Sequence, residues 1–135
     1  MKFVDTSYWV ALQVSRDRNH RDARALWGAG SLLTTTLILG ETWTYLNRRA
    51  GHQFAVGFLD RAQRSPALSI VHVDEKTERD AWAWLRRHDE REYSFVDATS
   101  FATMRRMKIR EALAFDGDFT AAGFTEVRPG KKRRS

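Results

Sequence analysis

The segment Phe3-Val4-Asp5 ends a short apolar run in an aspartate, and the chain repeats this pattern at Phe95-Val96-Asp97 and at Leu113-Ala114-Phe115-Asp116. A fourth acid, Glu41, interrupts the apolar segment formed by residues 37–43. Carboxylates beside core segments need a partner, because removing a charged oxygen from water costs several kcal/mol or shifts its pKa. Four such acids in one small chain indicate a shared cation, and hence a divalent-metal enzyme that acts on phosphate.

Strand-like and helix-like segments alternate along the whole chain. Strands are expected at residues 2–5, 32–35, 68–73, 112–115 and 124–127. Helices are expected over residues 6–14, 37–49 and 53–64, around residues 23–27, from a cap at Asp74 through residue 85, and from Asp97 to residue 107. Strands separated by helices pair in parallel, and the helices cover both faces of the sheet. We therefore predict an α/β fold with a central parallel sheet and helices on both faces.

This organisation gives the acids a common location. Asp5 and Asp116 each end a predicted strand, and Asp97 ends a short extended run before a helix. Ligand sites in open α/β sheets form beyond the carboxyl ends of the strands. Glu41 shares a helical stripe with apolar residues one turn before and after it, so we expect this stripe to face the core. The neighbours on this stripe are Leu37, Ile38 and Tyr45.

Each acid also has a simpler structural interpretation. Asp5 and Asp97 precede helices, where Asp is a favoured N-cap worth about 1 kcal/mol. The segment Asp116-Gly117-Asp118 resembles a turn. An alternative function is therefore a non-catalytic nucleic-acid-binding module in which the acids are helix caps. A receiver-type phosphoacceptor domain is less suitable, because the first strand lacks a pair of adjacent acids. The coincidence of all four acids favours the metal site.

Length and composition limit the class of protein. The chain has 135 residues, which is typical of one domain, and it has no cysteine. Disulfides, thiolate zinc sites and cysteine nucleophiles are therefore excluded. The N-terminus becomes acidic at Asp5, too early for a signal peptide, and no apolar stretch approaches the ~20 residues of a membrane span. We expect a cytoplasmic protein with no membrane partner.

The positive charge is concentrated at the C-terminus. The chain carries a net charge of +6, and four of its 23 basic residues are Lys131, Lys132, Arg133 and Arg134, so the preceding residues carry +2. We predict a folded domain over residues 1–127 and a basic tail over residues 128–135. A basic surface around an acidic pocket suits a polyanion held near a bound metal.

Four segments carry a resemblance to a known family. Residues 3–7, the helix with Glu41, residues 93–101 and residues 112–119 occur in the order and spacing of PIN-domain ribonucleases, and the chain resembles the VapC-type toxins among them. The resemblance covers residues 1–127. It implies a PIN-like fold, an endoribonuclease that depends on Mg²⁺ or Mn²⁺, and a homodimer restrained by a cognate antitoxin.

The resemblance assigns roles to particular acids. Asp5, Glu41, Asp97 and Asp116 match the family's acidic quartet and are the candidate catalytic and metal-binding residues. Many relatives have a basic residue and a histidine after the last aspartate, where this chain has Gly117 and Asp118. Asp118 is therefore either a fifth, outer ligand or a turn residue.

The chemistry of Mg²⁺ suits these side chains, because it is a hard cation that prefers carboxylates, waters and substrate phosphate. One or two ions per site are compatible with the quartet. Asp5 and Asp97 are expected to be the principal ligands, whereas Glu41 and Asp116 are expected to hold a second ion, or to bind through water and accept the proton from the attacking water. Hydroxyls near the acids orient a ligand, contact phosphate or cap a helix; the candidates are Thr6, Ser7 and Ser100.

A basic segment follows the helix that contains Asp97. We expect it to contact the RNA backbone, with a solvated basic surface as the alternative; its residues are Arg105, Arg106, Lys108 and Arg110.

Overall fold

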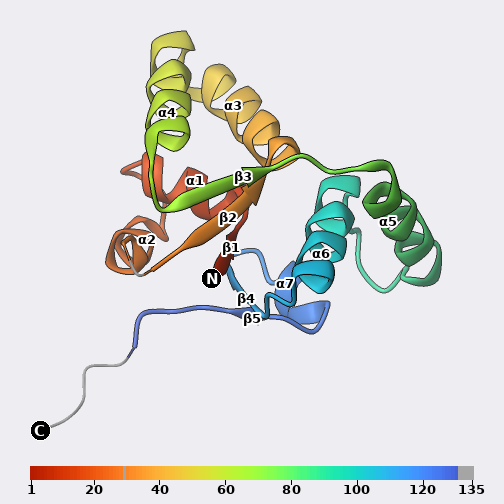
Figure 1. Cartoon of the computed structure of the whole chain (residues 1–135). Coiled ribbons are helices and arrows are strands. Elements are labelled where there is room, and N and C mark those ends of the chain that lie inside the picture. The colour runs from red at the N-terminus through yellow and green to blue at the C-terminus, as the bar shows by residue number, and fades with distance from the viewer. Residues whose placement is uncertain (29, 131–135) are drawn as a thin grey trace, which may run out of the picture.

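The computed structural model describes residues 1–28 and 30–130 (Figure 1). Within these residues, the strands are β1 (Lys2–Val4), β2 (Leu32–Thr35), β3 (Leu68–Val71), β4 (Glu111–Leu113) and β5 (Thr125–Glu126). The helices are α1 (Thr6–Gln13), α2 (His20–Leu26), α3 (Thr36–Ala50), α4 (His52–Arg64), α5 (Glu75–Arg87), α6 (Phe95–Met107) and α7 (Asp118–Ala121).

The strands form one parallel sheet in the order β3-β2-β1-β4-β5. The chain starts at the central strand β1, moves outward to β3, and returns to β4 on the other side of β1. The direction of winding therefore reverses between β1 and β4, which is where α/β sheets place their ligand sites. Phe3 pairs with Ala112 and Val4 with Leu113 across this position.

Helices cover both faces of the sheet, as predicted. Connections between parallel strands are right-handed. The helices that connect strands in the direction from β1 to β3 therefore lie on the opposite face from the helices that connect strands in the direction from β3 to β5. Accordingly, α1 to α4 lie on one side of the sheet, and α5 to α7 lie on the other (Figure 1). The predicted α/β fold is confirmed.

Aromatic side chains join the helices of the second face to the sheet. The Phe119 ring of α7 lies 6.0 Å from the Phe3 ring of β1 and 4.9 Å from the Phe101 ring of α6. All three side chains are fully buried, and full burial of a Phe contributes about 1.5–3 kcal/mol. This packing fixes the start of α7 and the body of α6 relative to β1.

Two local predictions are wrong. Phe95 and Val96 do not form an extended run before Asp97, because they are the first residues of α6. The Ser94 hydroxyl accepts a hydrogen bond from the Asp97 amide and starts the helix two residues earlier than expected. Residues 118–121, for which no helix was expected, form the short helix α7.

The predicted basic tail falls largely outside the described residues, which end at Gly130. Arg128, at its start, is bound to the folded domain. Its Nη1 donates to the Ala114 carbonyl at 2.7 Å, and its guanidinium lies 4.6 Å from the centre of the Phe115 ring.

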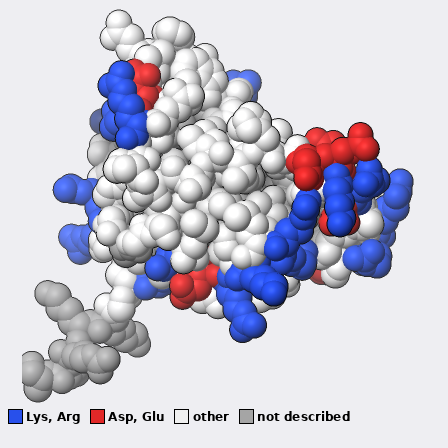
Figure 2. Space-filling model, viewed as in Figure 1, with Lys and Arg blue, Asp and Glu red and all other residues white. Residues whose placement is uncertain are grey.

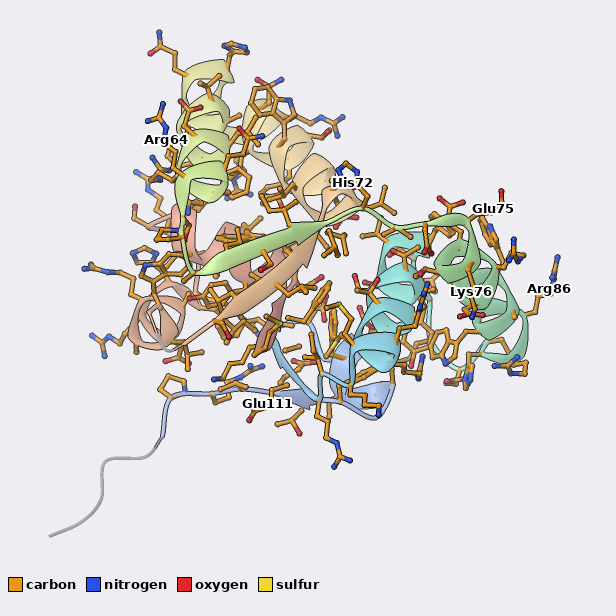
Figure 3. All side chains as sticks on the ribbon, viewed as in Figure 1. Arg64, His72, Glu75, Lys76, Arg86 and Glu111 are labelled. Carbon is orange, nitrogen blue, oxygen red and sulfur yellow. The ribbon has the colours of Figure 1, made fainter. Side chains whose placement is uncertain are left out.

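Charged side chains lie at the margins of the face shown in Figure 2, over α4 and α5, and its centre is largely uncharged. On α5, Glu75, Lys76 and Arg86 point away from the sheet (Figure 3). None of the described helices is long and apolar enough to cross a membrane.

Candidate functional site

Asp5 lies at the carboxyl end of β1 and is the N-cap of α1. Its Oδ2 accepts hydrogen bonds from the Ser7 amide at 3.1 Å and from the Ser7 hydroxyl at 2.7 Å. The same hydroxyl accepts a hydrogen bond from the Phe115 amide at 2.9 Å. Ser7 therefore ties Asp5 to the segment that follows β4.

Asp97 lies in the first turn of α6 and is half-buried. Its Oδ2 accepts a hydrogen bond from the Ser94 amide at 3.0 Å, and its own amide donates to the Ser94 hydroxyl at 2.9 Å. This reciprocal pair is a capping box, which fixes the direction of the carboxylate.

Asp116 lies in a turn after β4. Its Oδ1 accepts a hydrogen bond from the Asp118 amide at 3.1 Å. Gly117 has a φ of 83°, which side chains other than glycine's rarely adopt. This conformation explains why a glycine occupies the position between Asp116 and Asp118.

These three aspartates converge from distant parts of the sequence. One carboxylate oxygen from each of Asp5, Asp97 and Asp116 lies within 4.8 Å of the others. They line a pocket of about 530 Å³ at the carboxyl edge of the sheet, which is also lined by Glu41 and Asp118. The structure therefore brings all five predicted acids to one pocket, with three of them in close contact.

The pocket raises the pKa of each carboxyl in this group of three. Burial raises the pKa of Asp5 well above its usual range, and the negative charge of Asp116 adds to this effect. Burial is also the main cause that raises the pKa of Asp97, and it raises the pKa of Asp116 to about 6. Neighbouring acids raise both of these pKa values further. The acids therefore repel one another in their charged forms.

Glu41 lies on α3 and borders the pocket from a different side. The Thr6 hydroxyl donates a hydrogen bond to its Oε1. The expectation that its helical stripe faces the core holds for Ile38, which is fully buried, and is wrong for the rest of the stripe, because Glu41 is exposed and Tyr45, one turn later, is 38% exposed. Glu41 and Tyr45 line the pocket, which explains why an acid is accepted there without burial.

Asp118 is held by a basic residue of the loop before α6. Its Oδ1 accepts a hydrogen bond from Arg91 Nε at 2.9 Å, and Arg91 Nη2 lies 2.8 Å from the same oxygen. Arg91 Nη2 also donates to the Asp116 carbonyl at 3.4 Å. Asp118 therefore lines the pocket as half of an ion pair, whereas it is outside the close group of three.

Of the three candidate hydroxyls, the structure places two at the acids. Thr6 donates to Glu41, and Ser7 donates to Asp5. Ser100 is fully buried, and its hydroxyl donates to the Val96 carbonyl within α6 at 2.9 Å. It does not line the pocket.

The predicted basic contacts are not brought to the pocket. Arg105 lies over the rings of Trp84 and Phe124, and Arg106 pairs with Asp74 at 2.9 Å. These arginines belong to the last turn of α6, whereas Asp97 belongs to its first turn. Lys108 and Arg110 follow the helix, and neither lines the pocket.

Sequence reasoning missed the residues of the loop between α1 and α2. Asp17, Arg18 and Asn19 line the pocket, as does Tyr45 of α3. Tyr45 could have been noticed from its spacing of four residues after Glu41. Nothing in the sequence indicates the loop, because its position depends on how α1 and α2 pack.

The donor set suits a hard divalent cation. Three carboxylates within 4.8 Å provide oxygen ligands, and a cation would offset the burial and the mutual repulsion that raise their pKa values. Helix capping does not account for the arrangement by itself. Asp116 is not an N-cap residue, since that position of α7 is Gly117, and only its Oδ1 is used by the first amide of the helix. The geometry therefore favours a metal site over the alternative in which the acids are helix caps.

Comparison with known proteins gives a family and close relatives. A PIN-domain family model matches residues 2–125. The 23S rRNA-specific endonuclease VapC20 of Mycobacterium tuberculosis is 54% identical over 131 residues, which cover 96% of this chain and 99% of the relative.

Solved structures show the same fold. The crystal structure of Mycobacterium tuberculosis VapC20, described as a sarcin–ricin loop cleaving toxin, matches with a TM-score of 0.91 and 53% identity, covering 96% of this chain and all of the other. FitAcB from Neisseria gonorrhoeae matches with a TM-score of 0.65 at 16% identity, covering 96% of this chain and 98% of the other. At that identity the likeness concerns the fold alone.

Proposed function

Since the chain belongs to the PIN-domain family and is a metal-dependent endoribonuclease of the VapC toxin type, we propose that its substrate is the sarcin–ricin loop of 23S ribosomal RNA. The relative that is 54% identical over nearly the whole chain is named for cleavage of 23S rRNA, and its crystal structure is described by cleavage of that loop. Such a substrate agrees with a cytoplasmic location.

One structural observation carries the catalytic part of the proposal. Asp5, Asp97 and Asp116 come from β1, α6 and the segment after β4, and their carboxylates converge within 4.8 Å. Two of them are fixed by backbone amides, through Ser7 for Asp5 and through Ser94 for Asp97. A pocket held in this way is preorganised for a cation and for the phosphate that the cation attracts.

Mg²⁺ or Mn²⁺ is the proposed cofactor, in one or two ions per site. Asp5 and Asp97 are the proposed principal ligands, with Asp116 completing the group and Glu41 binding directly or through water. Such an ion, when bound, lowers the pKa of a water molecule and stabilises negative charge on the phosphate. Thr6 orients Glu41, and Ser7 orients Asp5.

Asp116 is the proposed proton acceptor. Its Oδ1 accepts a hydrogen bond from the Asp118 amide, so Oδ2 is available to accept a proton in the pocket. Asp118, paired with Arg91, is proposed to position this turn and not to bind the ion.

The proposed partners are a second copy of the chain and a cognate antitoxin. Crowded carboxylates form an anchor for a guanidinium, which pairs with carboxylate through two parallel hydrogen bonds. An antitoxin arginine placed among Asp5, Glu41, Asp97 and Asp116 would displace the metal and exclude RNA.

The substrate proposal is tested with purified ribosomes and with a synthetic sarcin–ricin hairpin. We expect a single cut within the loop in Mn²⁺, no cut in EDTA, and no cut by the Asp97→Asn variant in Mn²⁺. A hairpin with a scrambled loop should remain intact. Metal-dependent cleavage spread over unrelated RNAs, without preference for the loop, would contradict the proposed substrate and leave the nuclease activity standing.

A further inference from the structure

The acidic pocket has one basic side chain in its lining. Among the described residues that form its walls, Arg18 is the sole cation, and it comes from the loop between α1 and α2. The pocket volume of about 530 Å³ lies within the range of small-molecule sites, so there is room for a nucleotide beside a metal ion.

The guanidinium of Arg18 has no structural role in the described chain. Other arginines near the site are engaged, since Arg91 pairs with Asp118 and Arg128 with Glu126. Arg18 is exposed, and it forms no hydrogen bond or ion pair with any residue of 1–28 and 30–130. An arginine that lines an acidic pocket without pairing to an acid is available for another anion.

The loop backbone around Arg18 is fixed although its side chain is free. The Asn19 amide donates to Asp17 Oδ1 at 2.8 Å, and the His20 amide donates to the Asp17 carbonyl at 3.0 Å. His20 Nδ1 lies 2.8 Å from the Ala11 carbonyl, which ties the start of α2 to α1. Arg18 is therefore presented to the pocket by an ordered turn, which lowers the entropy lost when it binds.

We propose that Arg18 binds an RNA phosphate that flanks the scissile phosphate. The scissile group belongs at the aspartates, where a metal ion neutralises its charge, so the guanidinium on the loop wall is left for a neighbouring phosphate. Arginine suits this role because its planar fork matches two phosphate oxygens. The inference rests on the proposed ribonuclease function and adds a substrate-binding residue to it.

Arg16 provides a matched control for Arg18. It lies two residues earlier in the same loop, is also exposed, and does not line the acidic pocket. Arg16→Gln and Arg18→Gln remove the same charge from the same loop. A general electrostatic effect on RNA would weaken both variants equally, whereas a phosphate contact would weaken Arg18→Gln alone.

The test is single-turnover cleavage of the sarcin–ricin hairpin in Mn²⁺ at several salt concentrations. We expect Arg18→Gln to raise the half-saturating protein concentration roughly tenfold, the loss typical of one charge-assisted hydrogen bond. Its salt dependence should fall by about 0.7 in log–log slope, as for one lost contact to single-stranded RNA. Arg18→Lys should recover part of the affinity. Arg16→Gln should stay within about twofold of wild type.

A neutral phosphate in the substrate locates the contact. Methylphosphonate linkages are placed one at a time on either side of the cleaved bond. At the contacted phosphate, the wild type should lose affinity while Arg18→Gln loses nothing further. The proposal would be overturned if Arg16→Gln and Arg18→Gln lost RNA affinity equally. It would also be overturned if, at every linkage, the methylphosphonate lowered the affinity of Arg18→Gln as much as that of the wild type. Failure of the wild type itself to cut the hairpin would instead count against the proposed substrate.

Discussion

At the scale of single residues, Asp5 is the N-cap of α1, Asp97 completes the capping box whose N-cap is Ser94, and both are members of the acidic group at the same time. Oδ2 of Asp5 accepts a hydrogen bond from the Ser7 amide, and Oδ2 of Asp97 accepts one from the Ser94 amide. The other oxygen is left for the pocket. Capping and a place in the acidic group were opposed as alternatives in the sequence, but both are compatible in one residue, because a carboxylate has two oxygens. The capping hydrogen bonds hold the two proposed ligand side chains in place without a cation.

The first prediction separates these two roles. Asp5→Asn and Asp97→Asn should lower cleavage by roughly 100-fold or more, since even outer partners of metal ligands cost about 10–100-fold when lost. Asparagine still accepts the capping bond, and one repelling charge is removed. Thermal unfolding in EDTA should therefore occur at or above the wild-type temperature.

Asp74→Asn is the control for this experiment. Asp74 caps α5 through the Thr77 amide at 2.8 Å and does not line the acidic pocket. Its variant should keep full cleavage activity. Full activity in Asp97→Asn as well would remove the metal-nuclease account.

The second prediction concerns pH. The folded-state pKa of Asp116 is raised to about 6 from an ordinary value of 3.8, so the folded metal-free protein binds this proton more tightly than the unfolded chain. The charged form therefore destabilises the fold fully above about pH 6, and the effect disappears as the pH falls below 4.

In EDTA, Asp116→Asn should melt above wild type at pH 7.5, and the difference should shrink as the pH approaches 4. Side-by-side thermal scans across this range measure it. If the difference in melting temperature grew as the pH fell, folding would lower the pKa of Asp116 and not raise it. The size of the effect is reduced by solvent, because Asp116 is only partly buried and remains open to water.

At the scale of elements, the alternation of strands and helices was enough to predict the sheet. The start of α6 was misplaced because Phe95 and Val96 have strand-like side chains, although the pattern Ser94-x-x-Asp97 is a capping box that could have been recognised. The stripe around Glu41 was misread for a different reason. A helical stripe can face the core at one end and an open pocket at the other, as Ile38 and Tyr45 do, and the spacing of its residues does not reveal the change.

The third prediction concerns the connection between α1 and the end of β4. Ser7→Ala would leave the Phe115 amide without its acceptor and remove one donor from Asp5. Loss of a partner for such a group costs about 1–3 kcal/mol. Urea unfolding should show this loss, and cleavage should fall because Asp5 is no longer held beside Asp116.

Ser100→Ala is the matched control. The Ser100 hydroxyl donates to a carbonyl within its own helix, so its removal leaves no donor unsatisfied. We expect a smaller change in stability and normal cleavage. If both serine variants cleave equally well, the bond from Ser7 to Phe115 does not position the site.

At the scale of the whole molecule, a chain with a net charge of +6 carries a pocket lined by six acids. The sequence predicted four of them because each follows or interrupts an apolar segment, and it offered Asp118 as a neighbour in the turn after Asp116, whereas it missed Asp17. It did not predict Arg18. It placed RNA contacts at Arg105 and Arg106, but Arg105 lies over the Trp84 ring and Arg106 pairs with Asp74. Which exposed arginines reach a pocket depends on the packing of loops and helix ends, and short-range sequence patterns do not carry that information.

The fourth prediction concerns the basic C-terminal residues 131–134. Their deletion should weaken RNA binding and lower its salt dependence by up to about 0.7 in slope for each lost phosphate contact. The cleavage rate at saturating RNA should stay close to wild type, because the reacting atoms lie at the aspartates. Binding measured by fluorescence anisotropy at several salt concentrations would show this, and an unchanged slope would mean that these residues do not touch RNA.

The central claim, that Asp5, Asp97 and Asp116 together bind a divalent cation, is tested most directly by thermal unfolding with and without Mn²⁺. At 100 times the dissociation constant, a metal that binds the folded state alone adds about 2.7 kcal/mol, or about 10 °C for a domain of this size. We predict this increase for the wild type and its absence in Asp97→Asn. Wild-type protein that melts at the same temperature in EDTA and in saturating Mn²⁺ would contradict the claim.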